Sequence, residues 1–107
     1  MIVTSRVINI YKQPNYAGAV YIGRKHNTIE HYGNPFPINS KQTRNDVIRM
    51  YEDWLRGTMH KDIEPERRQW ILDNLDFLKD KVLSCFCKPN PCHGDVLIKL
   101  LKEKYNE

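Results

Sequence analysis

The chain has 107 residues, of which 40% are hydrophobic and 28% charged, and its formal net charge is +4. This composition is typical of one globular domain and excludes a disordered chain. No apolar run is long enough to span a membrane, and segment 1–11 lacks the apolar core of a signal peptide. Three cysteines are too few for a disulfide scaffold, so we expect a reducing, cytoplasmic setting.

The positive charge is concentrated in the first 44 residues. They contain six basic side chains against one acidic side chain, a net charge of +5, whereas residues 45–107 have a net charge of −1. Positive charge suits an anionic partner, although a solvated basic face is the plainer interpretation. Because the basic residues are sparse, a small anion or nucleotide fits them better than a nucleic-acid duplex.

The first part of the chain predicts two strands and a loop. Alternation over residues 3–11 predicts a strand, and the short apolar run 19–22 predicts a second strand that ends at Gly23. Residues 24–39 are rich in polar residues, glycine and proline, and they predict a long irregular loop. Loops of this length in small domains are usually functional or mobile.

The second part predicts three helices and one more strand. Thr43 and Asp46 have the spacing of a capping box, and the helical apolar pattern that follows ends at Gly57. A second helix is expected from 64–65 with an apolar stripe that reaches Leu78, then a strand over 82–86 and a closing helix over 93–105. This order predicts one small Rossmann-like α/β domain over residues 1–107, with a short, mainly parallel sheet.

Segment 85–95 is the strongest local feature, because a strand leads through a proline-rich loop into a helix N-terminus. Backbone N–H groups and the helix dipole attract anions there. Ligands of open α/β sheets lie beyond the carboxyl ends of the strands. If the second and third strands are parallel, Arg24 and Lys25 face the same crevice as residues 92–95. Arg24 would pair with an anion through its guanidinium; the plain alternative is a helix cap after a core strand.

Other polar residues complete the predicted ligand site. Asp95 would accept ribose hydroxyls or simply cap the helix. His93 is a candidate acid or base, or a structural histidine. Asn34 offers an amide to a base or sugar, and Phe36 offers a ring for stacking, unless this loop only plugs the core. The predicted ligand-binding residues are Arg24, Lys25, Asn34, Phe36, Cys92, His93, Gly94 and Asp95.

The cysteines allow two further interpretations. Zinc could be held by residues among Cys85, Cys87, Cys92 and His93, but two separated C-x₂₋₄-C knuckles are lacking. We therefore expect no metal or other cofactor, and we expect Cys85 and Cys87 to be small core residues. Cys92 at a helix N-terminus is also a candidate nucleophile assisted by His93, although no arginine follows it as in phosphatase-type loops.

Four motifs together resemble a known family. They are YIGR at 21–24, GNPF at 33–36, the C-x-C pair at 85–87 and CHGD at 92–95. This combination resembles a domain-of-unknown-function family of about this length, found in bacteria and their phages. The resemblance implies a similar fold and site but no established activity. A phage origin, implied by the resemblance alone, is consistent with a protein that sequesters a nucleotide immune signal.

The sequence is consistent with three functions. The first is binding of a nucleotide-derived or phosphorylated small molecule. The second is an enzyme on the same class of ligand, such as an N-glycosidase, a transferase or a phosphohydrolase. The third is a zinc-stabilised adaptor for nucleic acid or protein. The expected partner is an anionic small molecule and not a membrane; a homo-oligomer is also considered, because one short sheet encloses little.

Overall fold

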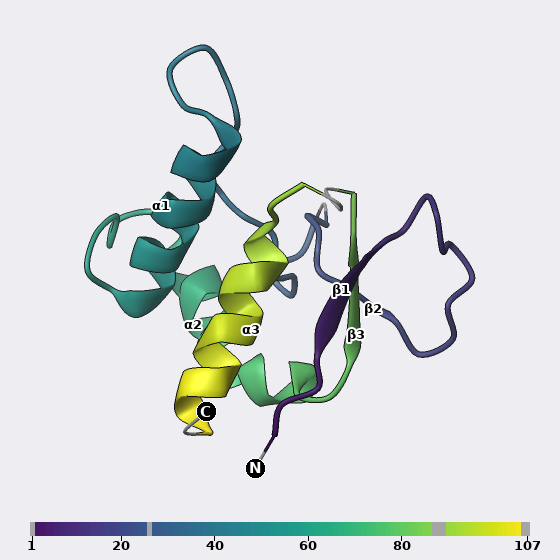
Figure 1. Ribbon diagram of the computed structural model, residues 1–107. Coiled ribbons are helices and arrows are strands. Elements are labelled where there is room, and N and C mark those ends of the chain that lie inside the picture. The colour runs from purple at the N-terminus through teal and green to yellow at the C-terminus, as the bar shows by residue number, and fades with distance from the viewer. Residues whose placement is uncertain (1, 26, 87–89, 106–107) are drawn as a thin grey trace.

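The computed structural model describes residues 2–25, 27–86 and 90–105 (Figure 1). Its sheet consists of β1 (Arg6–Asn9), β2 (Val20–Tyr21) and β3 (Val82–Cys85), in the order β1-β3-β2. Both neighbouring pairs are parallel, so the parallel arrangement expected of β2 and β3 is confirmed. The expected fold class, a small α/β fold with a short parallel sheet and three helices, is also confirmed.

The first two strands are shorter than the predicted ranges 3–11 and 19–22. Asn9 ends β1, because its carbonyl accepts from the amides of Lys12 and Gln13, and its side-chain oxygen accepts from Tyr11 at 2.8 Å. This is an asparagine turn, which competes with the ladder for the same backbone groups. Beyond β2, the Ile22 amide still donates to the Ser84 carbonyl at 3.0 Å. The chain therefore stays beside β3 up to the start of the long loop.

Helix α1 (Arg44–Arg56) begins and ends as the sequence predicts. The Thr43 amide donates to the Asp46 carboxylate at 2.8 Å, and the Asp46 amide donates to the Thr43 hydroxyl at 3.2 Å, which confirms the capping box. Gly57 adopts φ 75° and its amide closes the last turn. Only glycine takes this left-handed conformation without strain, so the helix stops there.

The predicted single second helix is wrong, because the chain forms two shorter elements. Helix α2 (Pro65–Asp73) is followed by a 3₁₀ helix, η1 (Leu75–Leu78). Asn74 separates them, and its side-chain amide donates to the Trp70 carbonyl at 2.8 Å. That bond offers the backbone an alternative to the regular ladder. The apolar stripe is nevertheless buried through Leu75 and Leu78, so the change of helix type leaves the core intact.

Helix α3 (His93–Lys104) packs directly on the sheet. Its first turn contains Gly94, where an added Cβ would lie 2.6 Å from Cδ1 of Ile22 and 2.8 Å from Cγ2 of Val7. In Figure 1 the three α-helices lie on one side of the sheet, and loop 10–19 extends from the other side. The close approach at Gly94 brings the N-terminus of α3 next to the ends of the strands. Within the described part of the chain, no helix combines the length and the apolar character needed to cross a bilayer.

One buried aromatic side chain of α1 fixes the long loop that precedes the helix, and another fixes the segment that follows it. The Tyr51 hydroxyl donates to the Tyr32 carbonyl at 2.6 Å, and the Trp54 indole donates to the Ile63 carbonyl at 2.6 Å. Both side chains are fully buried in the core between the helices and the sheet. Loop 24–39 is therefore tied to α1, and the two can form a wall of one site.

Candidate functional site

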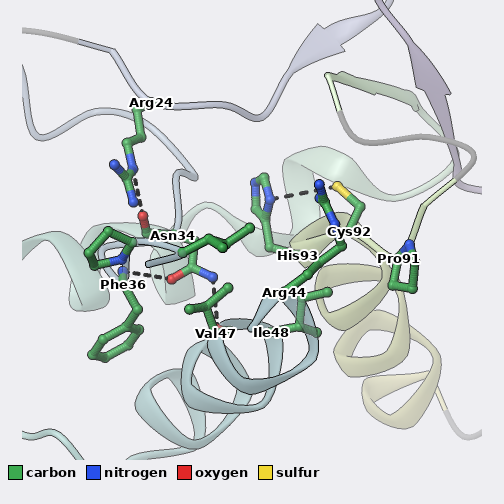
Figure 2. Close-up of a pocket in the computed structure, with 11 residues that line it drawn as sticks. Arg24, Asn34, Phe36, Arg44, Val47, Ile48, Pro91, Cys92 and His93 are labelled. Carbon is green, nitrogen blue, oxygen red and sulfur yellow. Dashed lines mark hydrogen bonds between the residues drawn. The ribbon is translucent and has the colours of Figure 1, made fainter. Parts of the chain in front are cut away.

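A cavity of about 360 Å³ lies where loop 24–39, α1 and the start of α3 meet (Figure 2). Its volume is at the lower end of the range typical of small-molecule sites. Arg24 follows β2 and residues 91–93 follow β3, so the cavity lies beyond the carboxyl ends of parallel strands, where ligands of open α/β sheets usually bind. The residues that line it are Arg24, Asn34, Phe36, Pro37, Ile38, Arg44, Val47, Ile48, Pro91, Cys92 and His93.

The cavity is lined by two cationic side chains, by the polar residues Asn34 and His93, and otherwise by mostly apolar residues. None of its described lining residues is acidic. The Nε group of Arg24 donates to the Asn34 carbonyl at 2.7 Å, which positions the guanidinium, and four of its five N–H donors remain on the terminal nitrogens. Among the described residues neither Arg24 nor Arg44 forms an ion pair. The lining can therefore supply positive charge to an anion.

Two helix N-termini border the same cavity. Arg44, Val47 and Ile48 belong to the first turns of α1, and His93 begins α3. Each N-terminus has a partial positive charge that favours an anion nearby. Arg44 is the first residue of α1, where a cation opposes the dipole, so its position is unfavourable for the isolated helix. An anion in the cavity would offset that cost.

Asn34 and Phe36 line the cavity, but the Asn34 amide and the Phe36 ring make contacts within the protein. The Asn34 side-chain amide donates to the Val47 carbonyl at 2.8 Å, and its oxygen accepts from the Phe36 amide at 2.9 Å. The Phe36 ring is 8% exposed and packs edge-on against Trp54, with centroids 6.4 Å apart. In Figure 2 this ring points away from Arg24. These contacts correspond to the loop that plugs the core, the plainer of the two predicted roles.

Cys92 and His93 form a contact on the cavity wall. The Nε2 atom of His93 lies 2.7 Å from the Ile22 carbonyl, which can only accept, so Nε2 carries the proton. Nδ1 of the neutral ring is then an acceptor, and it lies 3.6 Å from the Cys92 sulfur. Burial lowers the pKa of His93 and so favours the neutral ring. The hydrogen bond with the Ile22 carbonyl and the charge of Asp95 raise this pKa, whereas Arg24 and Arg67 lower it.

Lys25, Gly94 and Asp95 are not among the residues that line this cavity. Lys25 borders a smaller neighbouring cavity of about 210 Å³, which Arg24 also lines. Gly94 allows α3 to approach the sheet. The Asp95 carboxylate accepts from the Cys92 amide at 3.1 Å, which makes Asp95 a helix cap. Of the two predicted roles of Asp95, the structure shows the cap.

The structure describes three of the four residues considered as zinc ligands, namely Cys85, Cys92 and His93. Among residues 2–25, 27–86 and 90–105, no three His, Cys, Asp or Glu side chains are placed to hold a metal ion. Cys85 is 1% exposed, as expected for a small core residue. Cys92, which is predicted to bind the ligand, is also 1% exposed. Cys87 lies outside the described residues.

Arg44 is the cationic lining residue that the sequence interpretation missed. One signal for it exists in the sequence, because a base directly follows the N-cap Thr43, where an acidic residue is the favourable choice. Arg24, the other cationic lining residue, is distant in the chain, so only the folded structure shows that the two arginines line one cavity.

These features define a small α/β protein with a basic cavity beyond the carboxyl ends of its parallel strands. The family comparison gives this class a more specific identity. The chain belongs to the DUF4326 family, a domain of unknown function whose model matches residues 8–103. Neither the comparison with curated proteins nor the comparison with solved structures found a match.

Proposed function

We propose that this protein binds a small phosphorylated molecule of the nucleotide class in the cavity between loop 24–39, α1 and α3. The observation that carries the proposal is the lining of this cavity, which combines two guanidinium groups with two helix N-termini. Within the described part of the chain, neither guanidinium forms an ion pair and no carboxylate lines the cavity. Arginine binds phosphate through parallel N–H donors, and helix N-termini add to this attraction. Arg24 and Arg44 would hold the phosphate groups.

The apolar wall supports a ligand that also has an uncharged, flat part. Pro37, Ile38, Val47, Ile48 and Pro91 supply apolar surface beside the two arginines. A ligand pocket is usually lined by apolar side chains with a few placed polar groups, and a base or a similar ring would occupy such a surface. The volume of about 360 Å³ favours a mononucleotide over a larger ligand.

A finer proposal concerns the biological role. We propose a phage origin, which only the resemblance of the motifs YIGR, GNPF and CHGD implies. Such a setting suits a cytoplasmic protein that sequesters a nucleotide immune signal. Expression in a host whose defence uses a nucleotide signal should restore phage growth. The Arg24→Ala variant should not restore it, and equal rescue by this variant would contradict the sequestration role.

The direct test measures thermal stability in the presence of nucleotides, cyclic nucleotides, ADP-ribose and inorganic phosphate. A ligand at 100 times its Kd adds about 2.7 kcal/mol to stability, which raises the Tm of a domain of this size by roughly 12 °C. Arg24→Ala and Arg44→Ala should each weaken binding by about tenfold or more, because a charge-assisted hydrogen bond contributes about 1.5–3 kcal/mol.

Arg49→Ala is the matched control, because Arg49 is an exposed cation of α1 that pairs with Asp46 outside the cavity. It should bind as the parent does. No shift with any compound, or equal losses in Arg24→Ala and Arg49→Ala, would overturn the proposal.

An enzyme that acts on the same ligand is the second candidate, favoured by the Cys92–His93 contact on the cavity wall. After hours of incubation, the bound nucleotide recovered from the denatured protein should be intact if the protein only binds it. A product that forms with the parent and not with His93→Ala would establish the enzyme instead.

A further inference from the structure

The sulfur atoms of Cys85 and Cys92 lie 2.9 Å apart in the interior of the protein. Cys85 is the last residue of β3 and Cys92 is the N-cap of α3, so the contact joins the two elements at the wall of the cavity. Both residues are thiols in this structure. Each is 1% exposed, and Cys92 also lines the cavity, which supplies a route for a small reagent.

His93 completes the cluster as a proton acceptor. Its Nε2–H donates to the Ile22 carbonyl, so Nδ1 presents a lone pair to the Cys92 sulfur at 3.6 Å. The Gly94 amide donates to the same sulfur at 3.4 Å and would stabilise negative charge there. A thiolate is the reactive form of cysteine, and an adjacent base and a helix N-terminus both promote it.

We propose that Cys85 and Cys92 form an oxidation site, at which a small peroxide converts the two thiols to a disulfide. The thiol proton of Cys92 moves to Nδ1 of His93, and the thiolate attacks one oxygen of hydrogen peroxide. The sulfur–oxygen bond forms, the oxygen–oxygen bond breaks, and the leaving hydroxide takes the proton from His93 as water. The Cys85 sulfur then attacks the sulfenic sulfur of Cys92, and a second water leaves with the Cys85 proton.

The neutral state of His93 supports this assignment. Burial lowers its pKa, so the Nδ1 lone pair is available at neutral pH. The charged and titratable groups that act on the ring are Arg24 and Arg67, which lower the pKa, and Asp95, which raises it. The Tyr51 ring packs edge-on against the imidazole, with centroids 5.2 Å apart, and limits its rotation.

The test treats the folded, reduced full chain with hydrogen peroxide, blocks remaining thiols with an alkylating reagent and measures the intact mass. In the expected product Cys85 and Cys92 have each lost one hydrogen atom, and only Cys87 is alkylated. Chymotrypsin cleaves after Phe86 and separates Cys85 from the other two cysteines, so a crosslinked peptide pair reports a bond to Cys85. Tandem mass spectrometry of that pair then identifies the partner, which should be Cys92.

Three variants make the experiment decisive. Cys87→Ser should form the crosslink as fast as the parent. Cys92→Ser retains a good N-cap residue and should form none. His93→Gln should form it about tenfold more slowly at pH 7, and its rate should approach that of the parent above pH of about 8.5, where free thiols ionise unaided.

A bond that involves Cys87, or no crosslink in a protein with an unchanged circular dichroism spectrum, would overturn the proposal. An equal rate of crosslinking for the parent and His93→Gln across the pH range would show that His93 is not the proton acceptor. The chain unfolded in urea serves as the reference, because there all three cysteines compete. None of these readouts uses a nucleotide, so the outcome is independent of the proposed ligand.

Discussion

His93 couples stability to pH at the scale of a single residue. Burial lowers the pKa of His93, and burial also lowers the pKa of His31. A base whose pKa is lower in the folded state binds fewer protons there than in the unfolded chain. The contribution of each buried histidine to stability is therefore complete above the histidine pKa in the unfolded chain, about 6.5, and is lost as the pH falls below that pKa. The free energy of unfolding should therefore decrease in mild acid.

The expected result is a Tm that is constant from pH 8 to about 6.5 and then decreases. One group contributes at most about 1.4 kcal/mol per pH unit. His93→Gln keeps a side-chain donor for the Ile22 carbonyl and should reduce this dependence, while the contribution of His31 remains. Thermal denaturation across this pH range measures it, with His31→Gln as the companion variant. An unchanged slope in His93→Gln would show that His93 is not responsible.

At the scale of an element, the capping box in the first turn of α1 fixes the position of a residue that lines the cavity. Thr43 and Asp46 bond to each other's backbone amides, and these bonds fix the turn that contains Arg44. Hydrogen bonds to Thr43 lower the pKa of Asp46, which is consistent with an ionised cap at neutral pH. The capping box therefore positions a residue of the proposed site as well as the helix.

Thr43→Ala should destabilise the protein by about 1 kcal/mol, the usual cost of a lost N-cap. For a domain of this size the Tm should fall by roughly 5 °C. Thr43→Ser retains the hydroxyl and should stay close to the parent. Calorimetry of the three proteins measures the effect; a Tm of Thr43→Ala equal to that of the parent would mean that the cap does not stabilise α1.

Elements whose signals are local could be predicted from the sequence. The capping box, the stop at Gly57 and the three strand positions depend on neighbouring residues, and the structure shows each of them. The break at Asn74 was missed, because an asparagine in a helical pattern can face solvent or bond to the backbone, and only tertiary packing decides. The apolar pattern gives no sign of that choice.

The cavity could be predicted from the sequence only in part, because its lining depends on how the whole molecule folds. The rule that ligands lie beyond strand ends places Arg24 and residues 92–93 together without a structure. It does not give the direction of a side chain, so it could not separate Arg24 from Lys25 or show that the Asn34 amide is engaged by the backbone. The base directly after Thr43 marks Arg44 as unusual, but only the packing of α1 shows that its side chain lines the cavity.

Arg67 connects the helical layer to the loop that carries the site. Its side chain is 2% exposed. It donates to the Gly33 carbonyl at 2.5 Å and to the Glu64 carboxylate at 3.0 Å, and its guanidinium lies 5.1 Å from the centroid of a Trp54 ring. One side chain thus joins α2, α1 and loop 24–39. Its loss would leave the Gly33 carbonyl buried without its donor.

Arg67→Ala should lower the stability by about 2–3 kcal/mol, because a buried acceptor loses a charged donor. If the loop holds Arg24 in place, the variant should also weaken nucleotide binding, although Arg67 does not line the larger cavity. Urea denaturation and ligand titration of the same samples measure both effects. Lys61→Ala removes an exposed cation and should change neither. Weaker binding without a loss of stability would instead make Arg67 part of the ligand site, by way of the neighbouring cavity that it lines with Arg24 and Lys25.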